Sequence, residues 1–240
     1  MSETRPLTLS GAPEGYDALL IAREIEKTAA PVVHIARDAR RLAAMAAALD
    51  FFAPGVPRLT LPGWDCLPFD RVSPNPDVSA ARMATLAALT HGMPTERWIL
   101  LTTISAATQR LPARAVIERA SFSARVGDRI DEQALRAFLV RMGFSQAPTV
   151  TEPGDFAVRG GIIDIYPPGE AGPVRLDLFG DTLDGARRFD PATQRTTKKL
   201  QAVELAPVSE VILDEAAITR FRQNYRIEFG AGTADDPLYE

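Results

Sequence analysis

The sequence predicts an α/β protein with two unlike domains. Over residues 1–118, short strand patterns alternate one for one with helix patterns, which is typical of a parallel sheet with helices on both faces. After Pro112 this alternation stops, and short strand patterns bounded by glycine and proline follow one another. We therefore expect a smaller α+β domain with antiparallel strands over residues 119–208.

Length, charge and cysteine content exclude several classes of protein. A chain of 240 residues holds one large domain or two small ones, and its net charge of −4 argues against a nucleic-acid coat or a binder of anionic membranes. The single Cys66 excludes an internal disulfide and a zinc site built from several cysteines. The chain has no signal-peptide core and no run of about 18 apolar residues, so we expect a cytoplasmic protein.

The first domain is defined by apolar residues at helical spacing and by short apolar runs. Aspartate is favoured before a helix because its carboxylate accepts backbone N–H groups that the first turn leaves unpaired. In chain order we expect a helix over 17–29, a buried strand over 31–36, a helix capped by Asp38, a strand over 58–61, a loop over 62–76, a helix capped by Asp77 and a strand over 98–103.

The second domain starts with alternating residues and continues with one amphipathic helix. In chain order we expect a strand over 120–126, a helix from Asp131 to Gly143 with Leu135, Phe138, Leu139 and Met142 inward, two or three short strands over 150–195, and a last helix from Asp214 to about Tyr225.

The strand pattern over residues 174–179 has two different faces, because successive side chains of a strand point to opposite sides. The apolar face consists of Val174, Leu176 and Leu178. The other face carries a planar cation, a carboxylate and an aromatic ring, namely Arg175, Asp177 and Phe179. Arginine and aromatic side chains on a solvated sheet face are what a protein-binding hot spot requires.

Arg159 precedes Gly160-Gly161 on the neighbouring segment and is a further candidate for this surface. Two structural alternatives stay open. Arg159 can pair with Asp155 or Asp177, and Phe179 can fold under the edge of the sheet.

No phosphate-binding loop is recognisable before the first helix, where the chain reads Ser10-Gly-Ala-Pro-Glu-Gly-Tyr-Asp17. A P-loop needs a lysine on the phosphates and a serine or threonine on magnesium. Here Tyr16 and Asp17 follow Gly15, and Glu14 adds a second carboxylate that would repel phosphate. We therefore predict no nucleotide hydrolysis, no cofactor and no catalytic residue in this chain.

Two other groups of polar residues have a functional and a structural interpretation. A set of aspartates could form a divalent-metal nuclease site, but arginines that can pair with them and a plausible hairpin turn at Gly180-Asp181 favour structural roles. These aspartates are Asp155, Asp164, Asp177, Asp181 and Asp184. His34 and His91 lie far apart in the sequence, and we interpret both as structural.

The loop over 61–77 is rich in proline and aromatic residues. It could form a ligand pocket around Trp64, Phe69 and Arg71, or a rigid crossover whose rings pack on the sheet edge. The second interpretation is favoured. Cys66 in this loop has no evident base partner, so we expect an inert thiol.

This loop also carries a family resemblance. Gly63-Trp-Asp-Cys-Leu-Pro-Phe-Asp-Arg-Val-Ser-Pro-Asn-Pro-Asp-Val78 resembles the pattern Pro-Asp-Trp-Glu-Thr-Leu-Pro-Tyr-Asp-x-Phe-Ser-Pro-His near the start of the transcription-repair coupling factors (Mfd). The segments 154–168, 174–184 and 188–195 are similar to further hallmarks of the family, in matching order. Cys66 and Asn75 depart from the usual threonine and histidine.

The resemblance implies an N-terminal UvrB-like module of a longer protein. It implies three parts: a degenerate P-loop/helicase-like sheet domain over 1–118, a small α+β domain that binds UvrA over 119–208, and over 209–240 the truncated start of a third segment that returns to the first domain. RNA polymerase binding and ATP-driven translocation on double-stranded DNA would belong to the longer parent.

The implied function is a non-catalytic docking module that recruits UvrA to stalled RNA polymerase in transcription-coupled nucleotide excision repair. The family's interface positions fall on Arg159, Arg175 and Phe179. We expect both arginines to make charge-assisted, bidentate bonds to partner carboxylates and Phe179 to bury its ring as the apolar anchor.

A nucleic-acid-binding module is the alternative from a different class. It would contact DNA through a local basic patch. The candidates for this patch are Arg187, Arg188, Arg195, Lys198 and Lys199.

Overall fold

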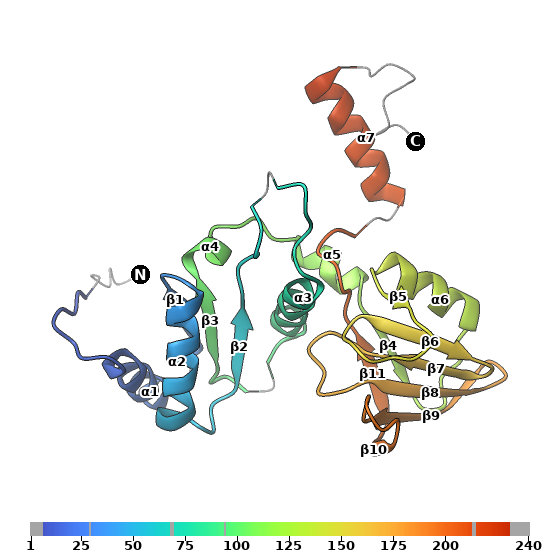
Figure 1. Cartoon of the computed structure of the whole chain (residues 1–240), viewed down its shortest axis with the longest axis horizontal. Helices are drawn as coiled ribbons and strands as arrows, with labels where there is room; N and C mark the ends of the chain where they lie inside the picture. Colours follow the sequence, from blue (N-terminus) through green and yellow to red (C-terminus); the bar gives the residue numbers. More distant parts are fainter. Residues whose placement is uncertain (1–6, 29, 68–69, 94, 213–214, 231–240) are drawn as a thin grey trace. The chain divides into compact units, whose positions relative to one another are not determined.

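A computed structural model describes residues 7–28, 30–67, 70–93, 95–212 and 215–230. Its contacts divide the chain into two compact units, which we treat separately (Figure 1). Unit 1 consists of residues 1–70 and 92–110, and unit 2 of residues 71–91 and 111–240. No helix in the described residues combines the length and apolar character that crossing a membrane requires.

Unit 1 contains the predicted parallel sheet. Strand β3 (Ile99–Thr103) pairs in parallel with both β1 (Val32–Ala36) and β2 (Arg58–Leu61), which gives the order β1-β3-β2. The helices of the unit are α1 (Tyr16–Lys27), α2 (Ala39–Phe52) and the short α4 (Ile104–Ala107). The expected order of helices and strands is thus confirmed for this part of the chain.

The core of unit 1 lies between one face of this sheet and the helices α1 and α2, which run side by side in Figure 1. Asp38 caps α2 as predicted, since its side chain accepts the backbone N–H of Arg41 at 2.8 Å. The buried side chains recur at helical spacing on both helices: Ala18, Ala22 and Ile25 on α1, and Leu42, Met45 and Leu49 on α2.

The prediction of a buried strand over residues 31–36 is wrong. Because β3 lies between the other two strands, β1 is an edge strand, and Val33 and Ile35 are 56% and 51% exposed. Because side chains alternate along a strand, Val33 and Ile35 point to the face of the sheet opposite to the one that α1 and α2 cover. The expectation of helices on both faces is therefore not met at β1 within the described part of unit 1.

Unit 2 has the predicted mixture of helices and antiparallel strands. Its six-stranded sheet has the order β10-β9-β8-β7-β6-β5, antiparallel except for the β5–β6 pair, and a second sheet pairs β4 with β11. The strands are β4 (Phe122–Arg125), β5 (Ser145–Gln146), β6 (Asp155–Arg159), β7 (Ile162–Ile165), β8 (Val174–Phe179), β9 (Thr182–Phe189), β10 (Thr196–Leu200) and β11 (Ala202–Leu205). The segment 150–195 thus forms more strands than the two or three expected.

The helices of unit 2 are α3 (Pro76–His91), α5 (Arg114–Arg119), α6 (Glu132–Arg141) and α7 (Glu215–Phe229). Helix α3 falls in the range predicted for the first domain, yet its contacts group it with unit 2. The expected start of α7 at Asp214 lies outside the described residues. The division into parts at residues 118 and 208 stays a prediction.

The expected cap of α3 is wrong by two residues. Asn75 caps this helix, because its side chain accepts the backbone N–H of Asp77 at 2.9 Å and its carbonyl accepts that of Ser79. Pro76 then occupies the first helical position, where a missing N–H costs nothing. Asp77 lies inside the first turn, where its charge still complements the helix dipole.

The core of unit 2 lies between the inner face of the six-stranded sheet, α6 and the β4–β11 pair. Asp131 caps α6 as predicted, and Leu135 and Leu139 of the helix and its C-cap residue Met142 belong to this core. The sheet contributes alternate residues of successive strands, including Phe156, Ile163, Leu176 and Leu183. The other side chains of these strands point to the opposite side, which we call the outer face.

Adjacent residues of α6 provide a test of this core. Leu139 has no exposed surface and Val140 is 61% exposed. We predict that Leu139→Ala lowers the free energy of unfolding by about 2–5 kcal/mol, because the substitution leaves a cavity. Val140→Ala should change it by less than about 0.5 kcal/mol. Urea unfolding followed by circular dichroism measures both, and equal effects would contradict the placement of α6.

Candidate partner-binding face

The structure places the three predicted interface residues on the outer face. In the β6–β7 hairpin Arg159 is paired with Ile162, and Ile162 is paired with Asp177 of β8. Asp164 of β7 is paired with Arg175 of β8. Paired residues of an antiparallel sheet share a face, so Arg159, Arg175 and, by alternation along β8, Phe179 all point to one side.

Asp164 is the centre of this face and has no exposed surface. Its carboxylate accepts Nε of Arg175 at 2.6 Å, Nη2 of Arg175 at 2.9 Å and Nη2 of Arg159 at 2.6 Å. Of the partners considered for Arg159, Asp155 and Asp177 are therefore both wrong. The neighbouring Ile163 and Ile165 point into the core, as expected.

Arg175 is held on several sides. Its side chain is only 20% exposed, its guanidinium carbon lies 4.6 Å from the centroid of the buried Phe189 ring, and Nη2 also approaches Oε1 of Gln194 at 3.4 Å. The hydrogen bonds to Asp164 raise the pKa of Arg175 above its already high value. Because the internal Asp164 takes two edge nitrogens, the expected bidentate bond from Arg175 to a partner carboxylate does not fit this arrangement.

Arg159 and Phe179 are the accessible members of the set. The Arg159 side chain is 51% exposed, and within the described chain its Nε and Nη1 have no hydrogen-bond acceptor. Phe179 is 83% exposed, so the alternative that it folds under the sheet is wrong. Its position follows from the turn at Gly180-Asp181, where Gly180 adopts a φ of 64° and reverses the chain directly after the ring.

Ile162 is the outer-face residue here that was not singled out from the sequence, whereas Arg187 and Asp177 were considered there for a DNA-binding patch and a metal site. Ile162 is 37% exposed beside Arg159, and Arg187 of β9 donates Nη2 to Asp177 at 2.5 Å. The Gly160-Gly161 pair in the sequence could have predicted that Ile162 lies beside Arg159, because it forms the two-residue turn between their strands. A two-residue hairpin fixes the register, and the register alone pairs Arg159 with Ile162.

The other polar candidates do not come together. Within the described residues there is no group of three or more side chains that could hold a metal ion. Asp155 accepts backbone N–H groups of residues 151 and 152, and Asp181 pairs with Arg129 at 3.4 Å. Burial lowers the pKa of His34 despite nearby Asp17, and burial raises the pKa of the Cys66 thiol. Phe69 of the proposed loop pocket lies outside the described residues.

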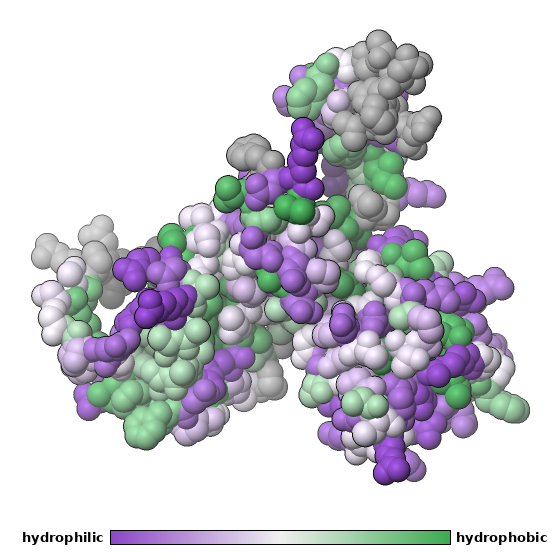
Figure 2. Space-filling model, in the orientation of Figure 1, coloured by the Kyte–Doolittle hydropathy of each residue, from purple (hydrophilic) through white to green (hydrophobic). Residues whose placement is uncertain are grey.

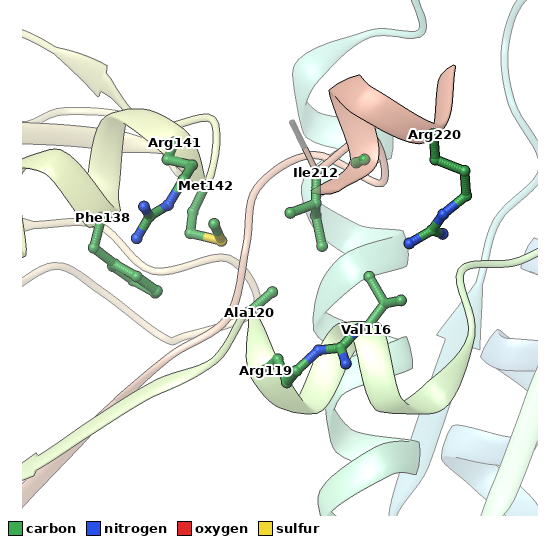
Figure 3. Close-up of a pocket in the computed structure, with 9 residues that line it drawn as sticks. Val116, Arg119, Ala120, Phe138, Arg141, Met142, Ile212 and Arg220 are labelled. Carbon is green, nitrogen blue, oxygen red and sulfur yellow. The ribbon is translucent and has the colours of Figure 1, made fainter. Parts of the chain in front are cut away.

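Unit 2 also has a pocket of about 320 Å³ between α5, α6 and α7 (Figure 3). Its lining combines an apolar floor with several arginines and contains no acid, histidine or nucleophile. The lining residues are Val116, Arg119, Ala120, Phe138, Arg141, Met142, Ile212, Ala217 and Arg220. The pocket therefore offers no catalytic set.

Comparison with known proteins identifies the class. Residues 122–211 match the family model described as the UvrB interaction domain. The chain is 32% identical over 224 residues to the transcription-repair-coupling factor of Escherichia coli (strain K12), covering 93% of this chain and 19% of that protein. It is 38% identical over 214 residues to the factor of Myxococcus xanthus, covering 86% of this chain and 17% of that protein.

These matches show that the chain carries a UvrB interaction domain, and that domain contains all of the outer face described above. Over most of its length, the chain is a homologue of the transcription-repair-coupling factors, the family that its motifs resemble. It spans about a fifth of the length of these relatives.

Asp164 provides a test of the geometry of the outer face. We predict that Asp164→Ala lowers the free energy of unfolding by about 2 kcal/mol, because it removes the shared acceptor of two guanidinium groups. Asp181 is the matched control, since its pair with Arg129 is 61% and 85% exposed. Asp181→Ala should cost less than about 0.5 kcal/mol. Chemical denaturation measures both, and an Asp164→Ala protein of unchanged stability would contradict the network.

Proposed function

We propose that this chain is a non-catalytic docking module that binds UvrA through the outer face of its UvrB interaction domain. The observation that carries the proposal is the 83% exposure of Phe179 on the same sheet face as Arg159 and Arg175. A large apolar ring in water, on a sheet face that also carries arginines, is typical of an interface hot spot.

The outer face has a charge that suits an acidic partner. Its cations Arg159, Arg175, Arg187 and Lys199 outnumber its carboxylates Asp155, Asp164 and Asp177, although the whole chain has a net charge of −4. Figure 2 shows polar and apolar residues interspersed over the visible side of unit 2, so the docking surface is argued from Phe179 and the arginines rather than from a continuous apolar patch. The partner surface should present carboxylates around an apolar pocket for Phe179.

The role of the module follows from the family. In transcription-coupled nucleotide excision repair, such a module would bring UvrA to a stalled RNA polymerase. Binding of RNA polymerase and ATP-driven translocation on double-stranded DNA would be functions of the longer protein, since the chain spans only 19% of the Escherichia coli relative.

The nucleic-acid alternative receives less support from the geometry. Strand pairing places Lys199 opposite Arg187 and Lys198 opposite Arg188, so these cations are divided between the two faces of the sheet. Arg187 is paired with Asp177 and Arg188 with Glu170. A duplex needs several accessible cations on one surface to displace counterions, whereas the outer-face arginines Arg159, Arg175 and Arg187 are each paired with an internal carboxylate.

Substitution of Phe179 and Arg159 tests the proposal. We predict that Phe179→Ala weakens UvrA binding by roughly 30-fold, because it removes the apolar anchor, and that Arg159→Ala weakens it by roughly tenfold. Isothermal titration calorimetry with the complete 240-residue chain measures both constants.

Matched controls come from the exposed side of α6. Val140→Ala and Arg136→Ala remove an exposed apolar and an exposed cationic side chain from another surface of unit 2, and should leave the affinity within twofold. Because Phe179 is exposed, Phe179→Ala should hardly change the melting temperature, whereas Arg159→Ala removes one of the three hydrogen bonds of the buried Asp164 and should lower it. Unaltered affinity of both Phe179→Ala and Arg159→Ala would mean that UvrA binds elsewhere or not at all.

A further inference from the structure

We infer that Gln194 is a positioning residue of the partner-binding face. Its amide helps to hold the guanidinium of Arg175, and Arg175 in turn fixes Asp164 and the direction of Arg159. The inference rests on the proposed function, since it assigns Gln194 a role at the same face.

The first observation is the backbone of Gln194. Its φ of 58° lies in the left-handed region, and among the described residues it is the one non-glycine with a positive φ. The turn that follows β9 imposes this conformation. Within that turn, Asp190 accepts the backbone N–H of Thr193 at 2.7 Å with its side chain and that of Gln194 at 2.8 Å with its carbonyl. A glycine would fit the turn without the steric penalty of a Cβ atom.

The second observation is the direction of the Gln194 amide. Its Nε2 donates to the carbonyl of Pro191 at 2.8 Å and approaches that of Val150 at 3.4 Å. A carbonyl oxygen can only accept, so the nitrogen must face these two groups and Oε1 must face the other way. There it meets Nη2 of Arg175 at 3.4 Å. This contact is long, and its effect is to limit rotation of the guanidinium rather than to bind it strongly.

The third observation is how completely Arg175 is enclosed. Phe189 lies against the face of the guanidinium, Asp164 takes Nε and Nη2, and Gln194 reaches Nη2 as a second acceptor. With Arg175 fixed, one site on Oδ2 of Asp164 is left for Nη2 of Arg159. The exposed nitrogens of Arg159 are thereby oriented before a partner arrives, which reduces the entropy lost on binding.

Two substitutions at Gln194 separate the side chain from the backbone. Both glycine and asparagine tolerate a positive φ, but Gln194→Gly has no amide and the side chain of Gln194→Asn is one carbon shorter. We predict that each variant weakens UvrA binding roughly three- to fivefold, because the guanidinium of Arg175 and with it that of Arg159 become less restricted, while melting temperatures stay at or above the original value. Arg195→Gln, in the adjacent exposed position, should bind within twofold.

A readout in the free protein tests positioning directly. In ¹H–¹⁵N spectra, the Nε–H of Arg175 should exchange slowly with water in the original chain and faster in Gln194→Gly and Gln194→Asn. A purely structural glutamine would instead lower the melting temperature and leave the affinity and this exchange rate unchanged. That result would overturn the inference.

The same assay distinguishes failure of the inference from failure of the proposed function. If Phe179→Ala and Arg159→Ala lose affinity while both Gln194 variants bind like the original chain, then Gln194 has no positioning role and the proposed function stands. If the original chain does not bind UvrA, the proposed function is wrong. In that case, faster Arg175 exchange in the Gln194 variants supports positioning, and unchanged exchange overturns it.

Discussion

A fully buried carboxylate holds the outer face of the six-stranded sheet together. Asp164 receives three hydrogen bonds from Arg159 and Arg175. An ionised carboxylate without exposed surface is unfavourable unless it is paired, so both arginines must remain close to it. This requirement limits where each guanidinium can lie. Arg175 becomes part of the fixed structure, and Arg159 keeps donors directed towards solvent.

The two faces of the sheet have different roles because strand side chains alternate. Inward residues pack with α6 and the β4–β11 pair in the core of unit 2. Outward residues combine the ion network with Ile162 and Phe179, whose apolar surfaces are exposed. Phe179 needs no network, since the turn at Gly180-Asp181 fixes its backbone. An aromatic ring has few side-chain torsions to lose, and the arginines of the same face are already oriented, so binding costs little freedom, which is why we assign docking to this face.

The sequence predicted what depends on local residues. Apolar spacing located most elements, and Asp38 and Asp131 were found as caps because capping involves residues only a few positions away. The exposure of β1 was not predictable from its apolar run, since burial depends on strand order. Alternation placed Arg175 and Phe179 on one face. The pairing of Asp164 and the contact of Gln194 with Arg175 arise between strands and turns distant in sequence, which periodicity does not relate.

The central claim is that UvrA contacts the outer face, and site-specific photo-crosslinking tests it most directly. Ile162 lies on this face between Arg159 and Asp177, whereas Val140 is exposed on α6 away from it. With p-benzoylphenylalanine in place of Ile162, irradiation in the presence of UvrA should give a covalent adduct. The same label in place of Val140 should give none. A chain that binds UvrA but forms its adduct only from position 140 would contradict the account.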